Sequence, residues 1–548
     1  MAMAVLTAVW ASQFAWVSPT NFSGTDEWLY LSLTSRGIID FPHTQRPLTL
    51  LWTLPGALLR HRFVGFHLVD GAYLLLSGWL VFLIARRLAP GDALTALSAG
   101  VFALVWAPRD MARLLTVQTT VNTGVTAAGL LALVLLLESW VRRRAVLLGL
   151  AAAVAFVASR SYEAVVPLLL AGPVLILWVG VRSRRAWLWA GVFGGVVILG
   201  GAVTALALRR SGVSYQLALG FDARPWPVVG RLARQFGFDV LPLLTPAPGL
   251  GGVGVLAAVA VFAIGYGLLA ASSSSTRSPA ASDAPTARAR LARLAALGAL
   301  LAALGYLPFC LLASTQSATR TQFLSRPGIA LLLAATATLL GSFVPARGRR
   351  AAAGLLGAWV VALGTANTIA MQGLWTEMSS YPAQTGLLRQ LTARAPDVRS
   401  HTLIVLLDEG GVFPAVFTFR HAVGYLYEQR AAGLVWGASD YLYTFTFDAE
   451  GVWLDPWPAI RRAWRDEPTR YAYGEVIVAR GGADGRLALL RDWPPELPPL
   501  PRSARYEPEA RIVRGGPPVR AQAILYEQTL AVRDGVTSDL MRHGASAR

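Results

Sequence analysis

The chain contains no lysine and a single cysteine, and only 15% of its 548 residues are charged. Soluble proteins carry about 25% charged residues, so this shortage argues against a soluble protein. The lone Cys310 lies in an apolar segment, which excludes an intrachain disulfide and a cysteine-based metal site. The sequence also lacks GxGxxG after a strand, Walker A, HExxH and GxSxG motifs. Nucleotide-binding, protease and hydrolase functions therefore have no support.

Apolar residues make up 54% of the chain and gather in runs of membrane length. Crossing about 30 Å of hydrocarbon takes about 20 residues, and such runs recur through the first two thirds of the sequence. We expect an α-helical polytopic membrane protein with about eleven transmembrane helices in residues 1–372 and a soluble α/β or α+β domain in 373–548. The expected helices are Met1–Val17, Val64–Ala85, Ala93–Ala107, Val121–Val141, Ala145–Ala158, Ala164–Val181, Ala186–Leu208, Leu250–Ala271, Leu291–Ala313, Pro327–Val344 and Ala351–Met371.

The formal net charge of +18 comes from arginines that gather in alternate connections between the apolar runs. Clustered positive charge in short connections marks the cytoplasmic side of a membrane protein, so we do not expect nucleic acid as a partner. The first loop, residues 19–63, and the C-terminal domain then face outward. We expect an integral protein of a bacterial cytoplasmic membrane with an extracytoplasmic C-terminal domain. The arginine-rich connections are Arg86–Arg87, Arg142–Arg144, Arg182–Arg185, Arg277–Arg293 and Arg347–Arg350.

Residue patterns in the C-terminal domain predict both helices and strands. The helices are expected at Gln384–Arg394 and His421–Arg430, and the strands at Leu403–Leu407, Tyr441–Phe447, Glu475–Ala479 and Leu487–Leu490. Proline-rich Trp493–Pro518 predicts irregular structure. The Ser/Ala/Pro-rich stretch Ser272–Arg288 predicts a flexible cytoplasmic linker.

The first loop places Asp26 and Glu27 side by side just after the opening apolar run. A carboxylate there can act as a general base toward an acceptor hydroxyl or help to hold a divalent cation. Alternatively, Asp26 is an N-cap for an amphipathic surface helix over Glu27–Arg36, with Gly37 as its stop.

Further acidic candidates are Asp110 and Glu163, each in a later outward connection. Either could instead pair with its sequence neighbour, Arg109 or Arg160. Outward arginines run against the positive-inside rule, and a guanidinium fork matches phosphate oxygens, although contact with lipid headgroups is the alternative. Together with the basic side chains of the first loop, the candidates for substrate binding are His43, Arg46, Arg109, Arg113, Arg160, Glu163, Arg320 and Arg326.

The first span leading into TDEWLY, the amphipathic segment and HTQRPL before the second span resemble membrane glycosyltransferases of the GT-C type. This class includes protein mannosyltransferases and aminoarabinose transferases. The resemblance covers the architecture of residues 1–372, and its specific motif is the loop with Asp26 and Glu27. It implies Asp26 as the general base, Glu27 as its support and Asp110 as the second-loop acid. The resemblance leaves open whether a divalent metal is required, because neither loop holds a DxD pair.

The function implied by this resemblance is inverting transfer of a sugar from a polyprenyl-phosphate donor to an acceptor at the outer face. The acceptor could be a glycan, a lipid or a protein. A polytopic transporter or lipid flippase is the main alternative, and it would favour ionisable or broken helices near the middle of the membrane. A non-catalytic scaffold for envelope assembly is a third possibility, in which the loop residues tolerate neutral substitution.

Overall fold

The structure is a computed structural model of residues 1–548. It describes all residues except 19–20, 22–23, 60–62, 107, 180–182, 212–219, 246–248, 273–283, 314–319, 514, 516–520, 522–524 and 526–548, and the side chains of 43, 63, 118, 208, 210, 211, 284 and 285 are outside the description too. Most of the expected linker Ser272–Arg288 therefore lies outside the described residues.

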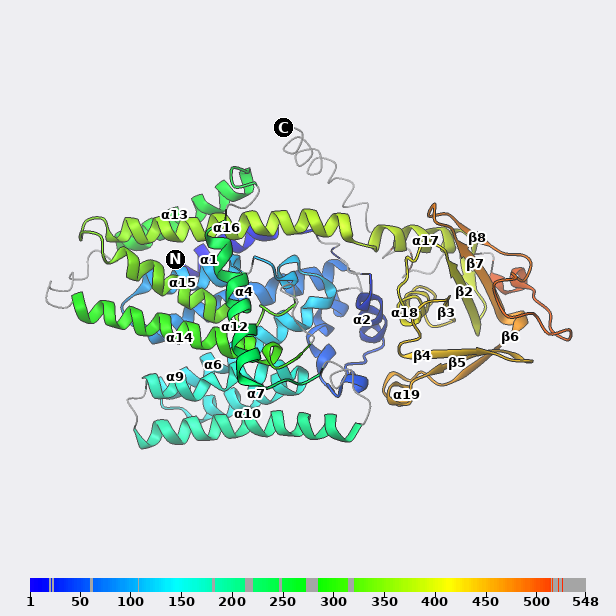
Figure 1. Ribbon diagram of the computed structural model, residues 1–548, viewed down its shortest axis with the longest axis horizontal. Coiled ribbons are helices and arrows are strands. Elements are labelled where there is room, and N and C mark those ends of the chain that lie inside the picture. The colour runs from blue at the N-terminus through cyan, green and yellow to red at the C-terminus, as the bar shows by residue number, and fades with distance from the viewer. Residues whose placement is uncertain are drawn as a thin grey trace. The chain divides into compact units, whose positions relative to one another are not determined.

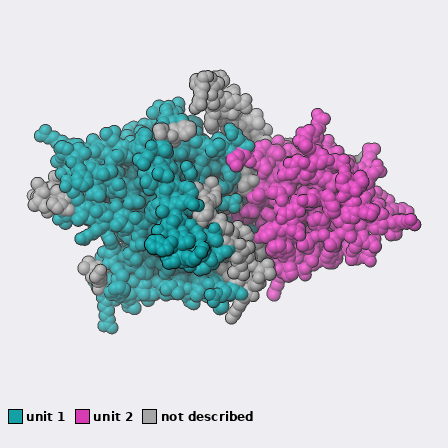
Figure 2. All heavy atoms as spheres, viewed as in Figure 1, with its two compact units in different colours: residues 1–21, 41–52, 67–377 teal, residues 22–40, 53–66, 378–548 magenta. Residues whose placement is uncertain are grey.

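The chain divides into two compact units, coloured separately in Figure 2. Unit 1 comprises Met1–Asn21, Phe41–Trp52 and His67–Glu377, and unit 2 comprises Phe22–Asp40, Thr53–Phe66 and Met378–Arg548. Two stretches of the first loop thus belong to the same unit as the C-terminal domain.

Unit 1 is helical, and its long helices run roughly side by side (Figure 1). Its main helices are α1 (Ala2–Phe14), α4 (Phe63–Leu88), α5 (Ala93–Val105), α6 (Thr120–Val141), α7 (Ala145–Ser161), α8 (Val166–Leu169), α9 (Ala171–Val179), α10 (Arg184–Ser211), α12 (Pro225–Val240), α13 (Val253–Ser272), α14 (Ala284–Cys310), α15 (Arg326–Gly341) and α16 (Arg349–Met378). Short 3₁₀ helices are η1 (Pro42–Thr44), η2 (Thr49–Trp52), η3 (Met111–Leu114), η4 (Val117–Thr119), η5 (Glu163–Val165) and η6 (Leu241–Leu243).

Each expected apolar run coincides with a helix of the structure. Among the described residues, six helices are long and apolar enough to cross a membrane, namely α4, α6, α10, α13, α14 and α16. The remaining expected runs form shorter apolar helices of 10–17 residues. Helix α12 was not expected, because the connection that contains it holds several arginines and prolines.

Small residues allow the closest helix contacts in unit 1. Helices α14 and α15 pack tightly, and a Cβ at Gly328 would lie only 2.1 Å from the backbone nitrogen of Ala302. Small side chains of this kind let membrane helices approach each other closely. The contact fixes the start of α15, where Arg326 lies.

Unit 2 combines helices with three sheets among its described residues. In the four-stranded sheet the order is β3-β2-β7-β8, with β3, β2 and β7 parallel, while β4-β5-β6 is antiparallel and β1 pairs with β9. The elements are α2 (Asp26–Ser35), α3 (Leu54–Leu58), α17 (Tyr381–Arg394), β1 (Asp397–Val398), β2 (Thr402–Asp408), α18 (Val416–Leu426), β3 (Ala431–Trp436), β4 (Tyr443–Phe447), β5 (Gly451–Pro456), α19 (Pro458–Trp464), β6 (Thr469–Ala472), η9 (Tyr473–Glu475), β7 (Val476–Gly481), β8 (Leu487–Leu489), η10 (Pro508–Arg511) and β9 (Ile512–Val513).

The central strand β2 explains why this domain folds around a parallel sheet. Its residues Thr402–Leu407 are all buried, as a strand covered on both faces requires. The expected strands at β2, β4, β7 and β8 and the expected helix at α17 are confirmed. The second helix was placed too late in the sequence, because α18 begins at Val416 and ends at Leu426 rather than covering His421–Arg430. Strands β1, β3, β5, β6 and β9 were not expected, and β9 lies within Trp493–Pro518, which was expected to be irregular.

Candidate functional site

Asp26 and Glu27 occupy the first turn of α2 in unit 2. The N-cap is Thr25, so the expected N-cap role of Asp26 is wrong. The expected surface helix is also wrong, since α2 is largely buried and packs against α18. Glu27 is fully buried, and its Oε2 accepts a hydrogen bond from the Thr25 N–H at 3.3 Å. A helix N-terminus favours ionised carboxylates.

Gln384 of α17 holds the chain just before this acidic pair. Its Oε1 accepts a hydrogen bond from Trp28 Nε1 at 2.9 Å, and its Nε2 donates to the carbonyl oxygens of Gly24 at 2.7 Å and Val412 at 3.0 Å. Gly24 has a φ of +79°, and an added Cβ would lie 1.8 Å from Ser380 Oγ. The turn that leads into Asp26 therefore requires glycine and is fixed by a buried amide.

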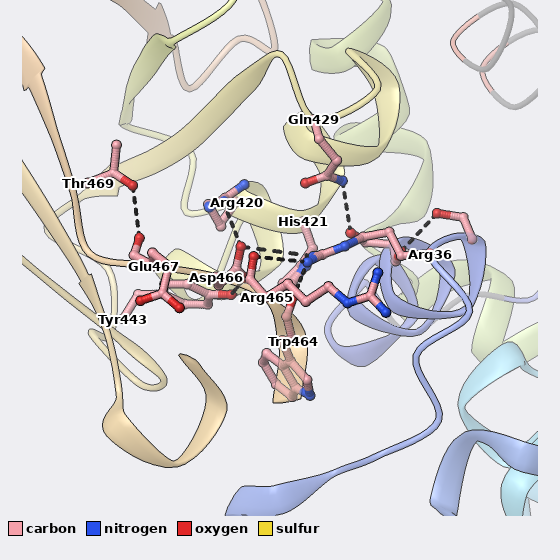
Figure 3. A network of polar contacts seen from close by, with 12 residues as sticks. Arg36, Arg420, His421, Gln429, Tyr443, Trp464, Arg465, Asp466, Glu467 and Thr469 are labelled. Carbon is pink, nitrogen blue, oxygen red and sulfur yellow. Dashed lines mark hydrogen bonds and ion pairs between the residues drawn. The ribbon is translucent and has the colours of Figure 1, made fainter. Parts of the chain in front are cut away.

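The other end of α2 is held by a polar network of the C-terminal domain (Figure 3). Arg36 donates to the carbonyl oxygen of Trp464 and lies 3.9 Å from Asp466 Oδ1. Trp464 Nε1 in turn donates to the carbonyl oxygen of Asp40 at 3.0 Å. The segment from Asp26 to Asp40 is thus bound at both ends within unit 2.

Asp466 is the centre of this network. Its carboxylate accepts hydrogen bonds from Arg420 Nη2 at 3.1 Å and from the Tyr443 hydroxyl at 2.6 Å. Burial alone would raise the pKa of Asp466, but Arg420, His421, Tyr443 and Arg36 together hold it below its usual value. Burial lowers the pKa of His421, which lies 3.1 Å from the Tyr443 hydroxyl, to about 3. This carboxylate is therefore ionised, and the imidazole beside it is neutral.

Unit 1 contains a second group of charged residues, which we call the buried charge cluster: Asp70, Asp110, Arg113, Asp239 and Arg326. Every one of these side chains is buried, and Asp110 is only 1% exposed. They come from α4, the connection after α5, η3, α12 and the start of α15. Four distant stretches of sequence therefore contribute charge to one part of the helical unit, since Asp110 is the N-cap of η3, which contains Arg113.

Asp110 and Arg326 form the ion pair of this cluster, with Oδ2 and Nη2 3.7 Å apart. Asp110 Oδ1 also accepts the Ala112 N–H at 2.9 Å and so caps η3. Burial raises the pKa of Asp110, against the opposing charges of Arg326 and Arg113. Burial, followed by the charge of Arg326, lowers the pKa of Arg113 to about 9, so this guanidinium stays protonated at neutral pH.

The two outer carboxyl groups of the cluster are hydrogen bonded to neighbouring helices. Asp70 accepts from the hydroxyls of Thr119, at 3.2 Å, and Thr123. Asp239 accepts from the Tyr306 hydroxyl, and burial raises the pKa of Asp239 to about 7. Sequence reasoning missed Asp239, although it follows Arg231 and Gln235 at intervals of four residues and so shares their helix face.

Several polar atoms in and beside the cluster have no hydrogen-bond partner among the residues that the structure describes. They are Nε and Nη2 of Arg326, Nε of Arg113, Oδ2 of Asp110, and both Nε2 and Oε1 of the buried Gln322. Arg326 Nη2 and Asp110 Oδ2 do form the ion pair described above. Buried polar groups are nearly always hydrogen bonded, so these donors have capacity for a further acceptor.

The remaining candidates in unit 1 whose side chains are described are either bonded to other residues or exposed. Arg46 binds Glu163 through two nitrogens, at 2.7 and 2.5 Å, and stacks on the Tyr162 ring 4.3 Å from its centroid. Arg160 donates to Thr204 Oγ1 at 2.6 Å. Arg109 is exposed and lies 5.7 Å from the Phe238 ring centroid, and Arg320 is exposed. The side chain of His43 lies outside the described residues.

The alternative pairings of neighbours expected from the sequence are both wrong. Asp110 pairs with Arg326 rather than Arg109, and Glu163 pairs with Arg46 rather than Arg160. Within the described part of the chain, no group of three or more His, Cys, Asp and Glu residues is arranged to hold a metal ion.

Comparison with known proteins finds no matching family model and no matching curated protein. Among solved structures, the chain is similar to ArnT from Cupriavidus metallidurans bound to undecaprenyl phosphate, with 16% identity, a TM-score of 0.40, and coverage of 79% of this chain and 85% of that one. It is also similar to the Archaeoglobus fulgidus oligosaccharyltransferase tethered with an acceptor peptide, with 12% identity, a TM-score of 0.41, and coverage of 80% and 64%.

The apo form of the same oligosaccharyltransferase gives 10% identity and a TM-score of 0.43, over 98% of this chain and 78% of that one. ArnT and this oligosaccharyltransferase are GT-C membrane glycosyltransferases, the class that the first loop resembles. Identities and TM-scores this low describe a likeness of fold alone, and no activity follows from them.

Proposed function

We propose that this protein is a membrane glycosyltransferase that moves a sugar from a polyprenyl-phosphate donor to an acceptor hydroxyl at the membrane surface. The observation that carries the proposal is a set of buried donors without a hydrogen-bond acceptor among the described residues: Nε of Arg113, Nε and Nη2 of Arg326, and Nε2 of Gln322. The other two nitrogens of Arg113 donate to the Val105 carbonyl oxygen and to Gln13 Oε1. Guanidinium groups suit phosphate, because their planar fork matches two phosphate oxygens. The cluster thus has the chemistry to hold the phosphate of a lipid-linked donor.

The proposed reaction is a displacement at the anomeric carbon of the sugar. The acceptor oxygen bonds to this carbon while the bond from the carbon to the phosphate oxygen breaks, and the electron pair leaves with the polyprenyl phosphate. The proton of the acceptor hydroxyl passes to a carboxylate base, and the resemblance of the first loop gives this role to Asp26. Arg113 and Arg326 stabilise the negative charge that develops on the departing phosphate. The configuration at the anomeric carbon is inverted.

The other candidates take supporting roles in this proposal. Glu27, buried beside Asp26, sets the charge at the start of α2, and Asp110 orients Arg326 through their ion pair. Arg46 and Glu163 position residues 41–52 rather than bind phosphate, since each already satisfies the other. We assign His43, Arg109, Arg160 and Arg320 to contacts with donor or acceptor groups outside the phosphate site.

Transport of a lipid or ion is the second candidate function, and Asp70 favours it. This buried carboxyl lies within α4, a helix of membrane-spanning length, and ionisable groups inside spans often serve in transport. Its hydrogen bonds from Thr119 and Thr123 equally suit a structural role. The two functions differ in product, because transport leaves the donor chemically unchanged.

The deciding experiment measures sugar transfer in proteoliposomes from a panel of radiolabelled polyprenyl-phosphate sugars, with a membrane extract as the source of acceptor. We expect Asp26→Asn to lower transfer by about 10²–10⁴-fold, the usual contribution of a general base. The exposed Asp492→Asn in unit 2 is the matched control and should keep wild-type transfer. Equal transfer by Asp26→Asn would remove Asp26 as the base.

The phosphate site has a separate test that needs no sugar. Binding of radiolabelled polyprenyl phosphate to the purified protein should fall at least tenfold in Arg326→Gln, while Arg144→Gln, an exposed arginine in an arginine-rich connection, should bind like the wild type. Unchanged binding by Arg326→Gln would contradict the phosphate assignment. Movement of the labelled donor across the bilayer with no transfer from any sugar would favour transport.

A further inference from the structure

Helix α12 has its polar and apolar faces reversed relative to a helix of a water-soluble protein. One stripe, Arg231, Gln235 and Asp239, points into unit 1, and the last two are buried. The opposite stripe, Trp226, Val229, Ala233 and Val240, is exposed. Trp226 is 84% exposed and Val229 is 54% exposed. A soluble helix would turn the apolar stripe inward and the charged stripe outward.

Polar contacts from the middle of the helix to its end fix this orientation. Arg231 donates to the carbonyl oxygen of Cys310 at 2.9 Å and pairs with Asp222 at 2.5 Å. One turn further, Gln235 Oε1 accepts from Thr321 Oγ1 at 2.8 Å, and after another turn Asp239 accepts from Tyr306. Rotating α12 to cover its apolar stripe would break all of these contacts, so the exposed stripe belongs to the folded state.

The surroundings of α12 point to lipid as the medium for this stripe. The helices on either side in sequence, α10 and α13, are both long and apolar enough to cross a membrane. The unit's long helices lie along one direction, and α12 runs across it (Figure 1). A helix between two spans and crosswise to them has the orientation of a segment that lies along the membrane surface.

The residues in and around the stripe are typical of the membrane–water interface rather than of the hydrocarbon centre of the bilayer. Tryptophan is enriched at the boundary between membrane and water, and Trp226 is more exposed than Val229 and Val240. Arg224 and Arg234 are also exposed and lie toward the flanks of the helix. Arginines in these places can bind anionic headgroups while the apolar side chains enter the acyl region.

We propose that α12 is an interfacial helix whose Trp226–Val229–Ala233–Val240 stripe lies in bilayer lipid. Its Arg231–Gln235–Asp239 stripe, which includes one member of the buried charge cluster, then lies between the lipid and the rest of that cluster. This inference does not depend on the proposed glycosyltransferase function. If α12 is interfacial and the protein is a glycosyltransferase, the buried charge cluster lies at the depth of the lipid headgroups, which is also the depth of the phosphate of a polyprenyl-phosphate donor.

The test is the solvent accessibility of nitroxide labels in proteoliposomes of the full chain containing anionic lipid. Labels are placed on Val229→Cys or Ala233→Cys after Cys310→Ala, because Cys310 is the protein's one cysteine. Leu199→Cys on α10, 57% exposed in a membrane-length helix, serves as the lipid reference. The exposed Thr446→Cys in unit 2 serves as the water reference.

Labels on the stripe should collide with oxygen at a rate close to that of the label at position 199. Their collision rate with a water-soluble nickel chelate should be at least threefold lower than that of the label at position 446. Nickel collisions equal to those at 446 would place the stripe in water and overturn the proposal. Low collision rates with both reagents would overturn it too, because they would show a second copy or another protein on the stripe.

A second measurement avoids cysteine variants. Lipids brominated near the headgroup should quench part of the wild-type tryptophan fluorescence, and Trp226→Phe should lower that quenched part. An unchanged quenched part would contradict the placement of Trp226 in lipid. Trp453→Phe, a substitution in strand β5 of unit 2, is the matched control.

Discussion

Asp110 and Arg326 lie 3.7 Å apart inside the helical unit, with 1% and 5% of their side chains exposed. They are separated by most of the helices of unit 1 in sequence, and the pair connects the segment after α5 to the start of α15. A buried ion pair contributes little net stability, because removing two charges from water offsets their attraction. Its retention at this position fits a role in orienting Arg326.

Removing both partners of this pair should cost less than the sum of the two single losses. Asp110→Asn and Arg326→Gln each leave an uncompensated buried charge, which costs about 3–5 kcal/mol. The double variant should recover at least about 1 kcal/mol of the summed loss, because contacting residues are not additive. Thermal unfolding of the four proteins in detergent measures this coupling. Additive losses would show that the two charges do not stabilise each other.

Gln384→Leu should loosen the start of α2. The apolar side chain leaves the buried Trp28 N–H and the Gly24 and Val412 carbonyl oxygens without the partner they have in the native protein, at about 1–3 kcal/mol for each unsatisfied group. Hydrogen exchange of residues 24–30 should rise at least tenfold. Gln390→Leu, on the same helix but partly exposed, is the control. Unchanged exchange in Gln384→Leu would mean that α18 alone holds α2.

Arg46→Lys should weaken the attachment of residues 41–52 although the charge is kept. A lysine cannot make the paired hydrogen bonds that Arg46 makes to Glu163, nor stack its planar group on Tyr162. We expect a loss of about 1.5 kcal/mol, seen as faster hydrogen exchange in this segment. Arg142→Lys, which replaces an exposed partner of Glu138, should leave the segment unchanged.

Unit 2 should lose stability in mild acid because of His421. Its pKa of about 3 in the folded state lies below the ordinary value of 6.5. Below pH 6.5, His421 therefore binds a proton in the unfolded chain but stays neutral in the folded domain. Stability should fall by up to about 1.4 kcal/mol per pH unit from pH 6.5 toward 3. The lowered pKa of Asp466 adds a loss in the same direction only at lower pH, near and below its ordinary value.

Hydrogen exchange of α18 at pH 6.5 and 4.5, corrected for intrinsic rates, measures this effect. His421→Phe keeps a ring in the same place and should flatten the dependence. His401→Asn replaces a half-exposed histidine and should keep the wild-type dependence. An equal pH dependence in wild type and His421→Phe would exclude His421 as its source.

Elements set by local sequence were predictable, since an apolar run of membrane length dictates a helix whatever surrounds it. The same holds for β2, whose continuous run of Leu, Ile and Val needs burial on both faces. Helix α18 was placed too late because its first half, Val416–Arg420, mixes aromatic and branched residues that favour strands.

The partners of charged residues were not predictable, because they depend on which distant segments meet. Asp110 and Glu163 each have an arginine within three residues, yet both pair with arginines more than 100 residues away. Asp239 was overlooked because α12 looks like an ordinary polar connection until its polar residues are placed on one face. The burial of α2 likewise depends on α18, which lies almost 400 residues further along the chain.

This separation has a consequence for biosynthesis. Helix α2 leaves the ribosome early, but its packing partner α18 follows only after the whole helical unit has been made. At ordinary synthesis rates of about 5–20 residues per second, the delay is roughly 20–80 s. During that interval the buried face of α2, with Trp28 and Leu29, has no domain to cover it. Asp26 and Glu27 therefore gain their final positions only after α18 has been made.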